Sequence, residues 1–182
     1  MTFASSGTRG DRVVVEQIDA IRWRLAEDIR YVGERDEFIV PAGYVTDFAT
    51  VPRVAVWLIP RFGLYTPAAI LHDFLLTHCL ESGRINSTDA DGLFRRAMKD
   101  LGVPPARRWL MWTGVRWGAL FNRSRRKGWS KDALGVLALT AAFAWLAIPM
   151  ATVGLALIPW ALIEFFASLP GRRKTTVGSL ST

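Results

Sequence analysis

Cysteine is almost absent from this chain of 182 residues, where Cys79 stands alone. A single cysteine forms no disulfide within its own chain, so a disulfide scaffold typical of small extracellular domains is excluded. The first twelve residues, MTFASSGTRGDR, contain no apolar stretch of the kind that a secretory leader needs. Together these two absences predict a domain that folds in a reducing cytoplasm.

Several catalytic motifs are missing as well. The sequence has no serine-hydrolase elbow, no glycine-rich phosphate loop and no paired-cysteine zinc motif. It has only two histidines, His72 and His78, which disfavours metal phosphohydrolases that need a further histidine upstream. Disorder is excluded too, because 51% of the residues are hydrophobic and 12% are aromatic.

Charge is nearly absent from one long run. The net charge of the chain is +7, yet Glu164 is the only charged residue among the 37 residues from Ala133 to Leu169. A helix of about 20 apolar residues crosses the hydrocarbon core of a bilayer. This run is therefore long enough for one crossing with a tail or for two short crossings, and a buried helical pair in a soluble fold is the remaining alternative.

The middle and the flanks of the run favour two crossings. Pro149, Thr152 and Gly154 lie at the midpoint, where a turn between two helices would fall. Clusters of lysine and arginine flank both ends of the run, and such residues stay on the cytoplasmic side of a membrane. We therefore predict a membrane-anchor helical hairpin with both ends in the cytoplasm.

The remaining sequence predicts an α+β head. Residues 13–18, 20–32 and 37–49 are rich in β-branched and aromatic side chains and predict a small antiparallel sheet. The predicted fold is this sheet followed by a helical part and the C-terminal hydrophobic (transmembrane) helical hairpin. The predicted divisions are a flexible N-terminus (1–12), the head (13–128), the anchor hairpin (129–170) and a basic polar tail (171–182).

Three helices are predicted in the head. Thr66 as N-cap and Pro67 at the first position begin one that ends at Ser82–Gly83. Ser87 or Thr88 caps the next, which ends at Gly102. A third, from Ala106, is rich in tryptophan and arginine, a pattern typical of nucleic-acid binding or of a membrane interface. The apolar run that follows it favours the interface, so membrane lipid is the expected partner and nucleic acid is disfavoured.

One group of polar residues has the composition of a reactive site. His72 and Asp73 lie in the first helix, and Asp89 and Asp91 open the second. The short link between these helices makes them neighbours, so Asp91 can reach His72 and fix its tautomer, as a general base requires. Asp73 and Asp47 would then be free to hold a hard cation. The alternative is a buried polar network without catalysis, in which Asp47 caps a turn or pairs with Arg53.

Three segments resemble the domain of unknown function 1353 family of tailed phages and prophages. They are VPAGYVTDFATVPR, which contains Thr46, Asp47 and Arg53, then FGLYTPAAILHDFLL, and then DADGLFRRAMKDLGVP. The likeness extends from Trp23 to Gly118, and the departures from the family pattern are Tyr44, Thr50, Phe74 and Leu76. This resemblance implies a phage or prophage origin and no established activity.

The helix with His72 and Asp73 is also similar to that of phospholipase A2 enzymes. The similarity implies that His72 is the base, Asp73 a calcium ligand and Asp91 the residue that orients His72. The loop around Phe62, Gly63 and Tyr65 would supply carbonyl ligands. Leu76 stands where that enzyme family has a tyrosine, its glycine-rich loop is poorly matched, and its disulfides are absent.

Two hypotheses about function follow. The favoured one is a membrane-anchored phage or prophage protein with a structural or accessory role, whose partners are membrane lipid and other phage proteins. Its location would be the host inner membrane with the head in the cytoplasm, or the phage particle. The alternative is a calcium-dependent lipid ester hydrolase of the phospholipase A2 type.

Overall fold

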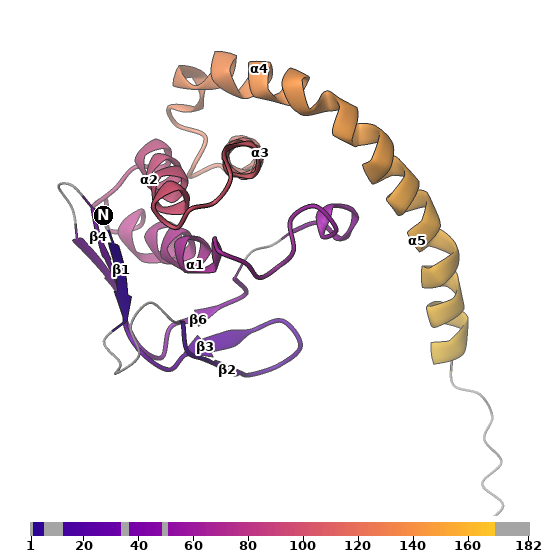
Figure 1. The fold of residues 1–182 in the computed structure, drawn as a ribbon, viewed down its shortest axis with the longest axis horizontal. Helices are drawn as coiled ribbons and strands as arrows, with labels where there is room; N and C mark the ends of the chain where they lie inside the picture. Colours follow the sequence, from indigo (N-terminus) through magenta and orange to yellow (C-terminus); the bar gives the residue numbers. More distant parts are fainter. Residues whose placement is uncertain (1, 6–12, 34–36, 49–50, 170–182) are drawn as a thin grey trace, which may run out of the picture. The chain divides into compact units, whose positions relative to one another are not determined.

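A computed structural model of the chain describes residues 2–5, 13–33, 37–48 and 51–169. It divides the chain into two compact units, Met1–Trp145 and Leu146–Thr182, so the first unit extends beyond the predicted end of the head at residue 128. The first unit is α+β, as predicted, with two small antiparallel sheets and a group of helices (Figure 1).

The strands form two sheets where the sequence predicted one. The first sheet has the order β1–β4–β5, made of Thr2–Ser5, Ile29–Val32 and Glu37–Val40. The second has the order β2–β3–β6, made of Val15–Gln17, Trp23–Leu25 and Val45–Thr46. The predicted strand 20–32 is divided into β3 and β4, and the predicted strand 37–49 is divided into β5 and β6. The two points of division lie side by side, since Ala42 N donates to Asp28 Oδ1 at 2.6 Å and Gly43 N donates to Leu25 O at 2.7 Å. Each half then pairs in a different sheet.

The first strand lies in a segment for which no strand was predicted. β1 pairs with β4 in antiparallel register, with Phe3 opposite Tyr31. The rings of these two residues are 4.8 Å apart and both are buried. Residues 2–5 are thus ordered within the predicted flexible N-terminus, and residues 6–12 lie outside the described part of the chain.

The helices begin close to the predicted positions. The helices of the first unit are α1 (Thr66–Phe74), which continues as a π-helical turn (Leu75–Cys79), α2 (Ser87–Asp100), α3 (Pro105–Phe121) and α4 (Ala133–Phe143). Pro67 and Pro105 lie in the first turns of their helices, where a missing N–H costs nothing. The cap of α2 is Asn86, and not Ser87 or Thr88, because its side chain accepts a hydrogen bond from Asp89 N at 2.9 Å.

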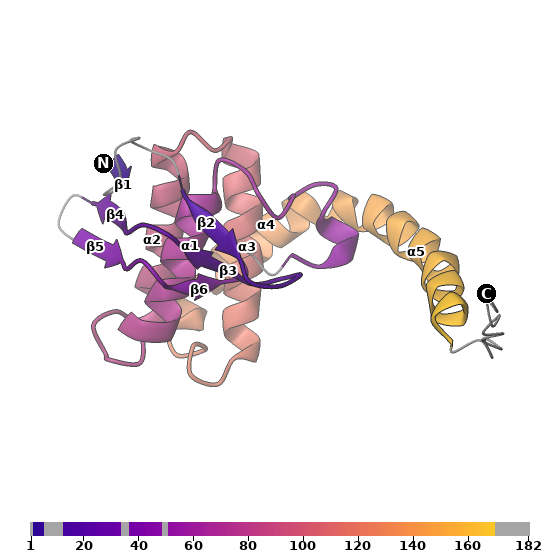
Figure 2. The ribbon, with the colours of Figure 1, turned by 90° about the horizontal axis from the view of Figure 1, so that it is seen from below.

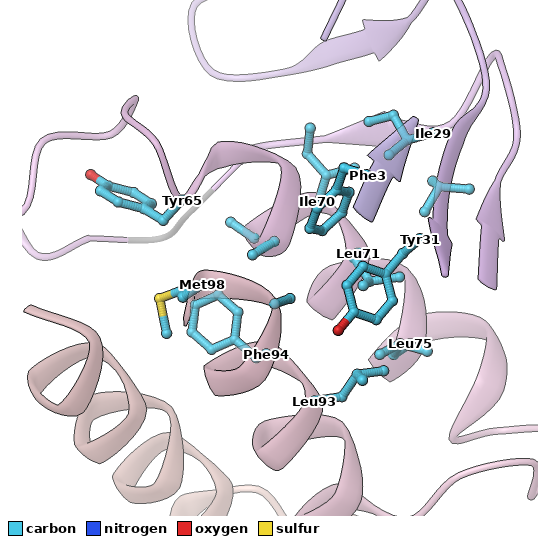
Figure 3. Close-up of a cluster of buried hydrophobic side chains, with 14 of the residues drawn as sticks. Phe3, Ile29, Tyr31, Tyr65, Ile70, Leu71, Leu75, Leu93, Phe94 and Met98 are labelled. Carbon is cyan, nitrogen blue, oxygen red and sulfur yellow. The ribbon is translucent and has the colours of Figure 1, made fainter. Parts of the chain in front are cut away.

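The hydrophobic core lies between the helices and the sheet β1–β4–β5. Figure 3 shows side chains from β1, β4, α1 and α2 meeting in one cluster. Ile70, Leu71 and Leu75 are fully buried on one face of α1 and its π-helical turn. α2 packs against both α1 and α3, so α1 and α2 are held side by side (Figure 2). This packing fixes the two helices that carry the candidate site.

The C-terminal apolar run is helical throughout, and the predicted hairpin turn is wrong. Ala133–Ser168 consists of α4, a 3₁₀ turn (Ala144–Leu146) and α5 (Ala147–Ser168). By length and composition this helical run is apolar enough to cross a membrane. Pro149, Thr152 and Gly154 lie inside α5. Pro149 falls in the first turn, where proline is tolerated, and Thr152 Oγ1 donates back to Ile148 O at 3.1 Å. The residues that resembled a turn are therefore compatible with the start of a helix.

Candidate functional site

The centre of the site is a contact between a histidine on α1 and an aspartate on α2. His72 Nε2 lies 2.7 Å from Asp91 Oδ1, so the predicted contact between these residues is present. Asp91 is fully buried and His72 is 8% exposed. Phe94, one turn after Asp91, stacks on the imidazole with ring centroids 4.7 Å apart. Two side chains of α2 therefore hold the imidazole of His72: the carboxylate of Asp91 contacts its edge, and the ring of Phe94 stacks on its face.

The hydrogen bond to Asp91 determines which nitrogen of a neutral His72 carries the proton. A carboxylate only accepts hydrogen bonds, so in the neutral imidazole Nε2 carries the proton and donates it to Asp91. The lone pair is then on Nδ1, which is the atom a general base would use.

Two arginines that the sequence analysis did not select hold the other lone pairs of Asp91. Arg116 Nη1 donates to Asp91 Oδ2 and Arg125 Nη2 donates to Asp91 Oδ1, both at 2.9 Å. Arg125 Nε also donates to Ser87 Oγ at 3.3 Å. Arg116 is fully buried, and a buried charge needs a partner of opposite sign. Asp91 is thus the centre of an ion-pair network as well as the partner of His72.

A second carboxylate takes part in this network. Arg116 Nη2 lies 3.2 Å from Asp132 Oδ2, an ion pair whose geometry is not that of a hydrogen bond. Trp129 Nε1 donates to Arg116 O at 2.7 Å. The two guanidinium groups and the two carboxylates of this network balance each other in charge. Arg116 lies on the buried face of α3 together with Trp112 and Thr113, a position that only the folded structure reveals.

The next carboxylate along α1, Asp73, lies beside residues 46–48, which have the sequence TDF and are called the TDF segment. Tyr44 OH donates to Asp73 Oδ2 at 2.9 Å, and Thr46 also hydrogen-bonds this carboxylate. Burial is the main cause that raises the pKa of Asp73, and the charge of Asp47 raises it further. The structure therefore brings Thr46, Asp47 and Asp73 together, as the prediction of a shared site requires.

The backbone of the TDF segment is strained. Phe48 has φ of +64°, a conformation that aromatic residues rarely adopt. Thr46 Oγ1 accepts a hydrogen bond from Phe48 N at 3.0 Å, and the ring of Phe48 is buried against Trp23 with centroids 5.6 Å apart. Strain of this kind costs about 1–3 kcal/mol and is concentrated at functional positions. The turn keeps Asp47 exposed beside Asp73.

The other predicted site residues have local structural contacts. Two hydrogen bonds join Gly63 and Thr66: Gly63 N donates to Thr66 Oγ1 at 2.9 Å, and Thr66 N donates to Gly63 O at 3.0 Å. Tyr65 is buried, and its ring lies so close that a Cβ on Gly63 would be 3.0 Å from Tyr65 Cε1. Asp89 belongs to the cap of α2, where it accepts a bond from Asn86. Arg53 is exposed at the start of a 3₁₀ turn (Arg53–Ala55).

The side chains around Asp73 offer few ligands for a calcium ion. In the part of the chain that the structure describes, no group of three or more His, Cys, Asp or Glu side chains is arranged to hold a metal ion. Asp73 and Asp47 supply two carboxylates, whereas calcium takes six to eight oxygen ligands. The carbonyl of Gly63, predicted as a ligand, accepts the Thr66 N–H. A calcium site at Asp73 and Asp47 stays a prediction.

The raised pKa of Asp73 predicts a pH dependence of stability. A folded-state pKa above the ordinary 3.8 means that the protonated carboxyl favours the folded state. This contribution is complete below pH 3.8 and is lost as the pH rises through the folded-state pKa. Asp73→Asn, which stays neutral, is therefore expected to gain stability relative to the wild type as the pH rises through that interval. Urea unfolding at a series of pH values measures this difference.

Asp19 provides the control of opposite sign. Its pKa is lowered, chiefly by a hydrogen bond from the Ile21 backbone N–H, so the folded state favours its ionised form. Asp19→Asn is expected to lose stability relative to the wild type as the pH rises from the acid side. Parallel curves for Asp73→Asn and the wild type would contradict the assignment for Asp73.

The fold and the site define an α+β domain in which a buried histidine–aspartate pair joins two packed helices. The chain belongs to the family described as protein of unknown function (DUF1353), whose model matches residues 23–115, just over half of the chain. No curated protein and no solved structure matches the chain. The match includes the TDF segment, His72, Asp73 and Asp91, and it ends one residue before Arg116.

Proposed function

We propose that this protein is a membrane-anchored member of its family with a structural or accessory role, and that α5 crosses the bilayer once. One observation carries this proposal. α5 has 22 residues, the sequence makes Glu164 its only charged residue, and none of its residues is buried. An apolar helix without a buried face is not stable in water, since soluble helices keep a polar face toward the solvent.

The length of α5 supports a single crossing. At 1.5 Å per residue, 22 residues extend about 33 Å, close to the ~30 Å of a bilayer core. α4, by contrast, packs on the first unit, because Val136 is fully buried and Trp117 Nε1 donates to Thr140 Oγ1 at 2.9 Å. α4 is thus part of the first unit, and only α5 is left for the membrane.

A single crossing alters the topology predicted from the sequence. A hairpin would keep both ends in the cytoplasm, whereas one crossing places residues 171–182 on the opposite side from the first unit. Five basic residues precede the apolar run (Arg123, Arg125, Arg126, Lys127 and Lys131) and three follow it (Arg172, Arg173 and Lys174). The larger number favours the cytoplasm for the first unit. The phage or prophage setting rests on the family resemblance of the sequence.

The topology is testable with fusions to the full chain in a bacterial host. Alkaline phosphatase after Thr182 is expected to be active, a fluorescent protein at the same place to be dark, and the chain to stay in the membrane pellet after carbonate extraction. Leu155→Arg/Ile158→Arg should release the chain from the pellet, because each central arginine costs about 3 kcal/mol of insertion.

The matched control has the same spacing on α4. Leu134 and Leu137 are exposed, so Leu134→Arg/Leu137→Arg should leave the chain in the membrane pellet. A fluorescent, phosphatase-inactive C-terminus would show that the single crossing is wrong. Full extraction of the wild type by carbonate would show that the anchor is wrong.

A second candidate function is lipid ester hydrolysis, and the observation that supports it is the contact of His72 Nε2 with Asp91 Oδ1. His72 Nδ1 would take a proton from water, and the hydroxide formed would attack the ester carbonyl carbon. The tetrahedral intermediate would then break the bond to the alcohol oxygen, which receives the proton from His72. Asp91 would orient the imidazole throughout. Release of fatty acid from phosphatidylglycerol vesicles by the full chain, with calcium present, tests this function, and an absence of release would refute it.

A further inference from the structure

Between β6 and α1 the chain forms a lobe that projects from the rest of the first unit, as Figures 1 and 2 show. We call residues 51–64 the apolar lobe. Three large apolar side chains in this lobe are exposed: Trp57 by 48%, Phe62 by 52% and Leu64 by 64%. Large apolar side chains that are gathered at the surface mark contacts with a partner or a membrane.

The apolar lobe is attached to the core on its inner side. Ile59 packs against the core cluster. The ring of Phe62 contacts Phe48 and Trp23, with centroids 5.1 Å and 5.9 Å away. Phe62 is therefore half in contact with the strained TDF turn and half open to solvent. These ring contacts hold Phe62 in place, so its partial exposure is a property of the folded surface.

The charge of the apolar lobe is of one sign. Its sequence, VPRVAVWLIPRFGL, has two arginines and no acidic residue. Both Arg53 and Arg61 are exposed. The indole N–H of Trp57 donates to Val54 O at 2.8 Å, so the ring carries no unpaired donor into an apolar surrounding. Tryptophan with arginine beside exposed apolar side chains is the composition of surfaces that enter the headgroup region of a membrane.

We propose that the apolar lobe docks on the surface of an anionic bilayer, with Trp57, Phe62 and Leu64 at the acyl boundary and both arginines among the phosphates. This deepens the membrane association proposed above, and it adds a contact separate from α5. Lipid is favoured over a protein partner because the lobe offers no acidic or uncharged polar side chain for directional hydrogen bonds, and its positive charge complements lipid phosphate.

Spin labels on the full chain test the proposal. In a Cys79→Ala background, a label is placed at Leu64→Cys in the lobe, at Lys99→Cys on the exposed side of α2, or at Leu155→Cys in α5. The protein is reconstituted into vesicles of phosphatidylcholine alone or with 30% phosphatidylglycerol. Collision with oxygen, which concentrates in lipid, is compared with collision with a water-soluble nickel complex.

The label at residue 64 is expected to favour oxygen in the vesicles that contain phosphatidylglycerol, while the label at residue 99 favours nickel in both. Each basic side chain near an anionic surface strengthens binding about fivefold. Arg53→Gln/Arg61→Gln should therefore lower the ratio of docked to undocked lobe about 25-fold and return the label at residue 64 to water.

Two results would overturn the proposal. A label at residue 64 that collides with nickel as freely as the label at residue 99 would show that the lobe stays in water. A label shielded from both agents would show that protein covers the lobe. The label at residue 155 tests α5 separately: its exposure to nickel would refute the anchor, while the lobe would still be judged by the label at residue 64.

Discussion

Replacing Asp91 with alanine is expected to lower the free energy of unfolding by about 3–5 kcal/mol, the range found when one partner of a buried ion pair is removed. Arg116 and Asp91 are both fully buried, and Arg125 and His72 bond the same carboxylate. The variant would leave a buried guanidinium with Asp132 as its one remaining counter-ion within the described residues. Urea unfolding of the full chain in detergent, followed by tryptophan fluorescence, measures the effect.

Asp89 gives the matched control on the same helix. It is exposed and takes part only in the cap of α2, so Asp89→Ala should cost about 1 kcal/mol or less. Asp91→Leu/Arg116→Met, which removes both charges, should recover part of the stability lost in Asp91→Ala. Equal unfolding free energies for Asp91→Ala and Asp89→Ala would contradict a central role for the ion-pair network.

The elements of the first unit were predictable where local signals act alone. Pro67 and the short link before α2 define the two helices whose packing brings His72 to Asp91. The division of the strands into two sheets was not predictable, because it depends on Asp28 reaching the backbone of Ala42, fourteen residues away. The apolar run shows the same limit, since Pro149 suits a turn and the first turn of a helix equally.

The site was predictable in part for a related reason. His72 and Asp91 are 19 residues apart on consecutive helices, so helix pairing alone brings them together. Arg116 and Arg125 are 25 and 34 residues from Asp91 and come from outside the family match. Among 23 basic residues, nothing local in the sequence distinguishes an arginine that becomes buried. Only the folded packing of α3 and the segment after it selects these two.

The contact of Tyr44 with Asp73 links the segment of residues 44–48 to α1. The hydroxyl of Tyr44 donates to Asp73 Oδ2 at 2.9 Å and shares a hydrogen bond with Thr77 Oγ1 at 3.2 Å. A phenylalanine would leave the ring contact with Phe74 and remove this bond. Asp73 would then keep Thr46 and the charge of Asp47. A Tyr44→Phe change would therefore alter the polar surroundings of Asp73 and leave the contact of His72 with Asp91 in place.

If the chain hydrolyses lipid esters, His72→Gln is expected to lower the rate of fatty-acid release about 10²–10⁴-fold, the contribution of a positioned general base. Glutamine is close in size to histidine and is able to donate to Asp91, yet it takes no proton from water. The assay uses the full chain with phosphatidylglycerol vesicles and calcium. His78→Gln is the matched control, because His78 is exposed and bonds Thr77 at 2.8 Å, away from Asp91.

Stability and catalysis must be separated in this test, since His72 also belongs to the buried network. Urea unfolding of His72→Gln shows whether the fold persists, and the rate is compared at a urea concentration where both proteins remain folded. A folded His72→Gln with the same rate as the wild type would show that any hydrolysis arises elsewhere. A loss of rate in the folded His72→Gln, with the rate of His78→Gln unchanged, would assign His72 as the base, and the network around Asp91 would then serve to orient it.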